Sequence, residues 1–179
     1  ATESGNISVD TTATTCKLSF GDGSVTFSPL SGEMTSYIHS GKEHVNQSPA
    51  AFKGFLPNIY RAYLDNDTHY RDKWIAAGYD DYACVCNKFD ASVDDGKAVV
   101  TVDYRLKSAK SIRPLGKVKI VYNVYANGVI DVKALFEPVS HKLLAAHMPR
   151  FGLTLEMPEC FGNVQYYGMG KEENLSDLY

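Results

Sequence analysis

The feature that most constrains the fold is a pair of alternating runs joined by a tight turn. Residues 118–125 and 129–137 alternate apolar with polar side chains, and Asn127-Gly128 lies between them. A period of two places every second side chain on one face of a strand, and Asn-Gly suits the positive φ angles of a short hairpin turn. The pattern predicts a β-hairpin with one buried face.

The same period recurs along most of the chain. Residues 16–20 and 24–27 alternate on either side of Gly21-Asp22-Gly23, which predicts a second hairpin. An aromatic share of 12% also favours strands, on which flat side chains pack well. Further strands are expected at residues 34–39, 98–106, 151–157 and 164–167. We therefore expect an all-β protein, a large antiparallel sandwich of about nine or ten strands.

Three segments interrupt the strand pattern. Residues 70–77 predict one short helix, because Trp74 lies on its apolar face and Gly78 can adopt the left-handed conformation that ends a helix. Residues 46–70 lack a period but carry aromatic side chains, which predicts a long ordered loop. Residues 1–15, rich in Ser and Thr, are interpreted as a frayed lead-in, so the domain is expected to occupy residues 16–179.

Composition argues against two classes of partner. The net charge is −3 and no cluster of Lys and Arg is dense enough to follow phosphates, so we expect no nucleic-acid partner. No apolar run approaches the length of a membrane span, and the first residues show no signal-peptide pattern. The compartment stays open between cytoplasm and periplasm.

Asp65-Asn66-Asp67 is the first candidate for chemistry. In an extended strand the two carboxylates would face the same way, about 6.6 Å apart along the chain. A retaining glycosidase needs its pair about 5–5.5 Å apart across a sugar, and a calcium loop needs a glycine and a distal glutamate that are missing here. The spacing alone favours an Asx-rich turn that satisfies its own backbone. We predict that Arg61 pairs with Asp65 or Asp67, and that the other acid and Asn66 bond to backbone.

Histidine and cysteine offer no motif of their own. His141 and His147 could in principle do acid–base work at a sugar, but no His-x-x-x-His frame supports a metal site, and surface or satisfied histidines are the favoured interpretation. Cys16, Cys84, Cys86 and Cys160 are expected to be buried or half-buried thiols. Tyr60, Tyr166 and Tyr167 could stack on a sugar ring, although packing within the sheets is the commoner role.

Four blocks of sequence resemble one family. Residues 60–67, Tyr-Arg-Ala-Tyr-Leu-Asp-Asn-Asp, resemble the Arg-Ala-Pro-x-Asp-Asn-Asp signature of the small-chain domain of glycoside hydrolase family 2 β-galactosidases. Residues 74–78 are similar to its Trp-x-x-Ala-Gly block, and residues 148–153 to its Pro-Arg-hydrophobic-Gly strand. Residues 164–174 parallel Trp-Tyr-Gly-Arg-Gly-Pro-x-Glu. All four occur in the family's order and at its approximate spacing.

The resemblance points to candidate site residues, and at several positions this sequence differs from the family motifs. The positions that match the motifs are Arg61, Asp65, Asn66, Asp67, Trp74, Arg150, Gly152, Tyr167, Gly168, Gly170 and Glu173. Tyr63 stands where the family has Pro, Met169 where it has Arg, and Lys171 where it has Pro. Because that Arg is polar, its loss puts one interaction of the glycine block in doubt.

The resemblance implies a galactose-mutarotase-like supersandwich without catalytic residues of its own. In the family, the acid/base and nucleophile glutamates belong to a separate barrel domain, and a downstream loop of the sandwich lends an aromatic side chain to the galactoside pocket. Neither has a counterpart in this sequence, so the chain corresponds to the N-terminal part of the sandwich domain. No metal ligand or cofactor is expected here, although parent enzymes of this kind often use Mg or Ca ions elsewhere.

Two functions follow as alternatives. The first is a non-catalytic portion of a β-galactosidase whose partners are the remainder of the enzyme and, through it, the galactoside substrate. The second is an independent carbohydrate-binding or aldose-epimerase-like module. If the sandwich is cut short at Tyr179, its exposed edges predict association, either as a symmetric homodimer or by exchange of a terminal segment, with residues 164–167 as one such edge. The alternative is a self-sufficient half-sandwich whose loops shield its edges.

Overall fold

The protein is described here by a computed structural model that covers residues 5–51, 54–139 and 148–167. It is built almost entirely of antiparallel β-sheets, with a single short helix among these residues. The all-β prediction is confirmed. None of the described helices is long and apolar enough to cross a membrane.

A five-stranded sheet forms the first layer, in the order β1-β2-β3-β4-β5. Its strands are β1 (Ile7–Thr11), β2 (Cys16–Phe20), β3 (Gly23–Phe27), β4 (Met34–His39) and β5 (Lys42–Glu43). The predicted hairpin of residues 16–27 is present, and Cys16 pairs with Phe27 across it. The lead-in prediction is wrong for β1, because Val9 pairs with Leu18 and the strand extends the sheet by one member.

The second layer is a four-stranded sheet of long strands in the order β10-β9-β8-β7. These are β7 (Tyr82–Asp94), β8 (Lys97–Ser108), β9 (Gly116–Tyr125) and β10 (Ile130–Pro138). The Asn-Gly hairpin is confirmed, with Gly128 at φ +81° and Ile130 paired with Val124. A bulge in β7 after Cys86 shifts its register against β8.

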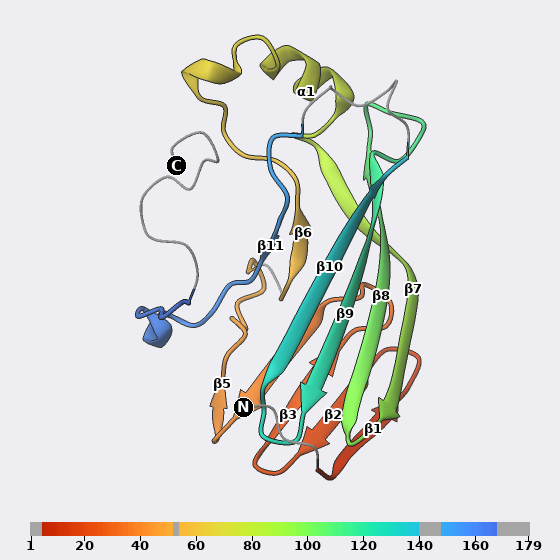
Figure 1. The fold of residues 1–179 in the computed structure, drawn as a ribbon, viewed down its shortest axis with the longest axis vertical. Helices are drawn as coiled ribbons and strands as arrows, with labels where there is room; N and C mark the ends of the chain where they lie inside the picture. The colour runs from red at the N-terminus through yellow and green to blue at the C-terminus, as the bar shows by residue number, and fades with distance from the viewer. Residues whose placement is uncertain (1–4, 52–53, 140–147, 168–179) are drawn as a thin grey trace.

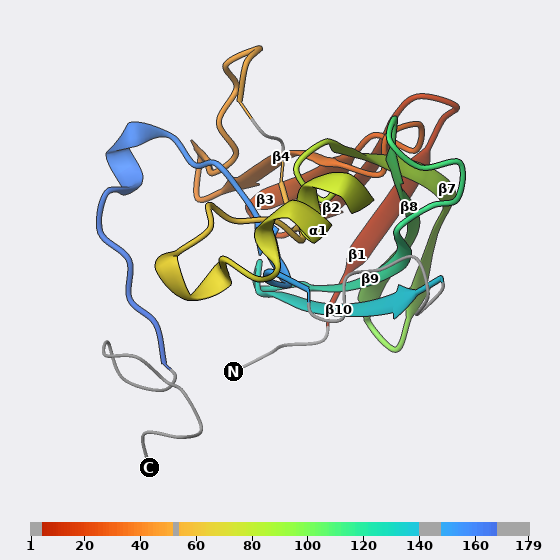
Figure 2. The same ribbon diagram turned by 90° about the horizontal axis from the view of Figure 1, so that it is seen from above.

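The core lies between the two layers. Figure 1 shows the five-stranded sheet behind one end of the long strands and α1 (Arg71–Ala77) at the other end; Figure 2 gives the view along the sandwich. Every second residue of β8 from Ala98 to Ser108 is buried, as the alternation predicts. Phe27 of one sheet meets Tyr122 of the other edge to face, with ring centroids 5.0 Å apart. Each such fully buried side chain stabilises the fold by about 1.5–3 kcal/mol.

A third, two-stranded sheet pairs β6 (Leu56–Asn58) with β11 (Gly152–Thr154). It joins the long loop to a segment almost a hundred residues later, and it lies alongside β10 and near α1 (Figure 1). The strand predicted at residues 151–157 is therefore present but shorter. The strand predicted at residues 164–167 is wrong, because this segment has no ladder partner among the described residues and is exposed throughout.

The helix prediction is confirmed, since α1 spans Arg71–Ala77 and Gly78 follows it at φ +87°. The Gly78 N–H donates to the carbonyl oxygens of Trp74 and Ile75, both at 3.1 Å. These bonds satisfy carbonyls that a helix end leaves free. A side chain at Gly78 would also overlap the Ser108 Oγ and Cβ atoms.

Candidate functional site

An ion pair organises the loop that enters α1. The Arg61 guanidinium donates from Nη1 to Asp67 Oδ2 and from Nη2 to Asp67 Oδ1, the second bond at 3.1 Å. Nη1 also donates to the Ala62 carbonyl at 3.0 Å. The Leu64 N–H donates to Asp67 Oδ2 at 2.7 Å, which ties the carboxylate to its own loop. The predicted pairing of Arg61 is confirmed, with Asp67 as the partner.

Charge and hydrogen bonding favour the ionised form of Asp67. The Arg61 hydrogen bonds, followed by the Leu64 N–H, hold the pKa of the Asp67 carboxyl below its usual range. The same pairing raises the pKa of Arg61. A carboxylate fixed in this way is an acceptor, whereas a general acid needs a raised pKa.

The remaining members of the Asp-Asn-Asp motif behave differently. Residues Asp65–Asp67 form a 3-10 turn rather than an extended strand. Asp65 contributes its carbonyl to the Thr68 hydroxyl, but its carboxylate and the Asn66 amide are exposed and have no hydrogen bond to the part of the chain that the structure describes. The prediction that both side chains bond to backbone is therefore not met.

Trp74 anchors the helix beneath this loop. Its side chain is only 2% exposed, and it packs within the main apolar core. The Tyr70 ring stacks on it with centroids 6.1 Å apart, and the Arg61 guanidinium carbon lies 5.8 Å from its ring. The Arg61–Asp67 pair and the helix anchor are therefore one connected cluster.

The loop is fastened to the sandwich by the first residues of β7. Tyr82 Oη donates to the Pro57 carbonyl at 2.9 Å and accepts the Ile59 N–H at 3.2 Å. Cys84 Sγ lies 3.7 Å from the same carbonyl. Neither role is predicted by a sequence motif, although alternation along the strand from Tyr82 onward places the two side chains on one face.

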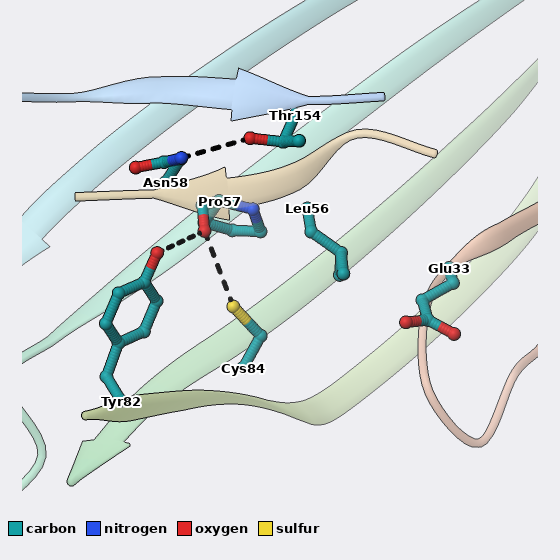
Figure 3. Close-up of a pocket in the computed structure, with 7 residues that line it drawn as sticks. All are labelled: Glu33, Leu56, Pro57, Asn58, Tyr82, Cys84 and Thr154. Atoms are coloured by element: carbon teal, nitrogen blue, oxygen red, sulfur yellow. Dashed lines mark hydrogen bonds between the residues drawn. The ribbon is translucent and has the colours of Figure 1, made fainter. Parts of the chain in front are cut away.

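A cleft of about 430 Å³ opens between β6 and the start of β7 (Figure 3). On one side Asn58 Nδ2 donates to Thr154 Oγ1 at 3.1 Å, linking β6 to β11. The Cys84 thiol is unsuited to nucleophilic attack, because burial, and then the charge of Glu33, raise its pKa to about 12. The residues that line the cleft are Glu33, Leu56, Pro57, Asn58, Tyr82, Cys84 and Thr154.

No metal centre emerges from the described residues. Across residues 5–51, 54–139 and 148–167, no three His, Cys, Asp or Glu side chains are placed to hold an ion. The four cysteines are free thiols: Cys16 is buried, and Cys84 and Cys86 are half-buried. The expectation fails for Cys160, which lies exposed in the short turn Glu159–Phe161. His141 and His147 lie outside the described residues.

Comparison with protein families decides the affiliation. Residues 20–178 match the model of the family described as beta galactosidase small chain. The chain belongs to the β-galactosidase small chain family. This match extends over all four motif blocks and over the strands from β3 onward.

Curated relatives of this small-chain protein are themselves named β-galactosidase. It is 26% identical to the protein of Halalkalibacterium halodurans over 87% of the present chain. It is 30% identical to that of Clostridium acetobutylicum over 84% of the chain, and 29% identical to that of Staphylococcus xylosus over 67%. The chain spans only 15%, 16% and 12% of those three proteins, respectively.

The other family positions lie apart from the Arg61–Asp67 cluster. Arg150 is exposed, and its Nη2 lies 3.2 Å from an ideal Cβ on Gly152, so the glycine leaves room for the guanidinium. Tyr167 is fully exposed, and Gly168, Gly170 and Glu173 lie outside the described residues.

At the position where the small-chain family has Pro, Tyr63 carries a contact of its own. Its ring lies beneath the Arg71 guanidinium, 5.0 Å from the centroid. The tyrosine therefore connects the loop to the first turn of α1.

Proposed function

We propose that this chain is a non-catalytic β-sandwich portion of a β-galactosidase and supports the subunit structure and galactoside pocket of that enzyme. The parent enzyme hydrolyses terminal non-reducing β-D-galactose residues. The observation that carries the proposal is the small-chain family match over residues 20–178 in a chain that spans 12–16% of its β-galactosidase relatives.

The geometry of the motif loop supports a structural role. Asp67 is engaged by Arg61 and the Leu64 N–H, and its pKa is lowered, so it is a poor proton donor. Asp65 lies in the same 3-10 turn and faces solvent. Catalytic carboxylates would come from another part of the parent enzyme, and so would any Mg or Ca ions.

The rest of the enzyme is the expected partner. The loop and α1 lie at one end of the sandwich, and the β6–β11 sheet leads from there along β10 (Figure 1); three of the four motif blocks fall in these segments. A contact surface for neighbouring domains is consistent with a loop held rigid by an ion pair and a buried tryptophan. The galactoside is reached through the parent rather than by this chain alone.

Calorimetric titration with galactose and lactose tests the proposal against an independent sugar-binding or epimerase-like module. We expect no measurable binding by the isolated chain, while the full-length parent binds both sugars. Tight binding by the chain alone would favour the independent module. If the chain also accelerated the interconversion of the α and β anomers of galactose, the epimerase-like module would be favoured.

A further inference from the structure

The cleft between β6 and β7 contains a carboxylate without a counter-ion. Glu33 lies on the loop between β3 and β4, half-buried, at the opposite end of the cleft from Tyr82 (Figure 3). Its hydrogen-bond partner is the Ser31 hydroxyl, 3.0 Å from Oε2. No Lys, Arg or His side chain of the described residues forms an ion pair with it.

A buried hydroxyl lies close to the loop that carries Glu33. Tyr104 is 1% exposed, and its hydroxyl has no hydrogen-bond partner among the described residues. That hydroxyl lies against Gly32, the residue before Glu33, because an ideal Cβ on Gly32 would be 2.6 Å from it. This hydroxyl is therefore a polar atom without a hydrogen bond to the described part of the chain, beside the loop that carries Glu33.

At its Glu33 end the cleft carries negative charge. Burial raises the pKa of Cys84 to about 12 and the charge of Glu33 adds to this, whereas for Tyr104 burial acts first and Glu33 is the last of several smaller causes; at the other end the charge of Arg150 acts on Tyr82 in the opposite sense. Cys84 lines the cleft, and Tyr104 is a buried core residue that pairs with Cys86 across the neighbouring strand. A cation placed here would be stabilised by the same field that disfavours thiolate and phenolate.

The other polar atoms of the cleft are already engaged. Asn58 donates to Thr154 and accepts the Tyr60 N–H at 3.2 Å. The Pro57 carbonyl accepts from Tyr82 and contacts Cys84. What remains is a wall of Leu56, Pro57 and the Tyr82 ring, with the Glu33 carboxylate at one end.

We propose that this cleft binds a small organic cation, an ammonium or guanidinium group carried on a compact apolar body. The cationic group pairs with Glu33, and the apolar body packs against Leu56 and Tyr82. A volume of about 430 Å³ suits a small ligand. A neutral ligand of the same shape would bury the carboxylate unpaired, which is costly, and an anion would add repulsion. The site does not depend on the galactosidase assignment.

Three probes of similar shape and different charge test this site. The full chain, labelled with ¹⁵N, is titrated with phenethylammonium, with 2-phenylethanol and with 3-phenylpropionate, and amide shifts are followed by NMR. We expect phenethylammonium to bind at least about tenfold more tightly than the alcohol, since hydrogen bonds to charged groups are stronger. Its shifts should centre on the amides of Glu33, Leu56 and Cys84.

Two variants and one control test whether Glu33 and the cleft beside Leu56 bind the ammonium probe. Glu33→Gln keeps the shape and removes the charge, so the preference for the ammonium should be lost. Asp65→Asn makes the same charge change on an exposed acid outside the cleft and should leave the preference intact. Leu56→Phe narrows the cleft and should weaken the ammonium even with Glu33 in place. Equal affinities for the three probes, shifts centred elsewhere, or a preference that survives Glu33→Gln would overturn the proposal.

Discussion

At the scale of single residues, Asp67 concentrates the electrostatics of the family motif. Three donors converge on its carboxylate, two from Arg61 and one from the Leu64 N–H. Asp65, two positions earlier, is exposed and has no such donors among the described residues. Asp65 can therefore serve as an internal control for Asp67, because both acids lie in the same turn and only Asp67 is held by donors from the part of the chain that the structure describes.

Acid titration is expected to distinguish them. The folded-state pKa of Asp67 lies below its unfolded value of about 3.9, so its contribution to stability is present above that value and is lost as pH falls through the folded pKa. Asp67→Asn should therefore lower the melting temperature at pH 7, and the difference from the wild type should shrink in acid. Asp65→Asn is the control. Equal melting curves for the two variants at pH 7 would contradict a stabilising pair.

Sequence spacing was sufficient to predict the Arg61 pair but not the contacts that fasten the loop. Arg61 and its acceptors lie within six residues, so local geometry limits the choice to two acids. The Tyr82–Pro57 bond joins residues 25 apart, and the Asn58–Thr154 bond joins residues 96 apart. No local pattern encodes such pairings, because they depend on how the sheets stack. The cleft and its Glu33 were missed for the same reason.

At the scale of elements, α1 is too short to persist without tertiary packing. Trp74→Ala should cost about 3–5 kcal/mol in the free energy of unfolding, because it empties a fully buried site in the core. Chemical denaturation followed by circular dichroism measures this. Lys73→Ala, one position away on the exposed side, should change stability by less than about 0.5 kcal/mol. An unchanged midpoint for Trp74→Ala would rule out the anchor.

The residue that follows α1 must be a glycine. Gly78 and Gly41 both have positive φ, +87° and +71°, but only at Gly78 would a Cβ meet other atoms within 4 Å. Gly41→Ala should cost about 1–2 kcal/mol from backbone strain alone. Gly78→Ala should cost about 1–3 kcal/mol more, because of the clash with Ser108. Equal losses in denaturant midpoint would mean that Ser108 moves away freely.

Strands in which apolar and polar residues alternate strictly were predicted well. Strands that form only because they pair with a neighbouring strand were not. The two hairpins and the strand 98–106 have one face that alternation marks as apolar and that is buried or half-buried in the structure; the strand 34–39 was also predicted, although only Met34 in it is buried. Strand β1 was missed because its residues are mostly exposed and only its pairing with β2 makes it a strand. Residues 164–167 alternate poorly and have no ladder partner among the described residues, so β-favouring side chains alone did not make a strand.

At the scale of the whole molecule, open sheet edges suggest self-association. β10 is the last strand of its sheet, and no described strand pairs with its outer edge. Its backbone groups could pair with a second copy, which would form a symmetric dimer. Light scattering over a concentration series should show a rise from monomer to dimer mass. A strict monomer at high micromolar concentration would mean that the edges are covered.

The proposed role makes this chain a part of a β-galactosidase that lacks the catalytic centre. Hydrolysis of nitrophenyl β-D-galactoside by the purified chain tests that claim most directly, with Asp65→Asn and Asp67→Asn run beside it. We predict no turnover above the buffer rate for any of the three, while the full-length parent hydrolyses the substrate. Measurable turnover by the chain that is abolished in either variant would falsify the claim.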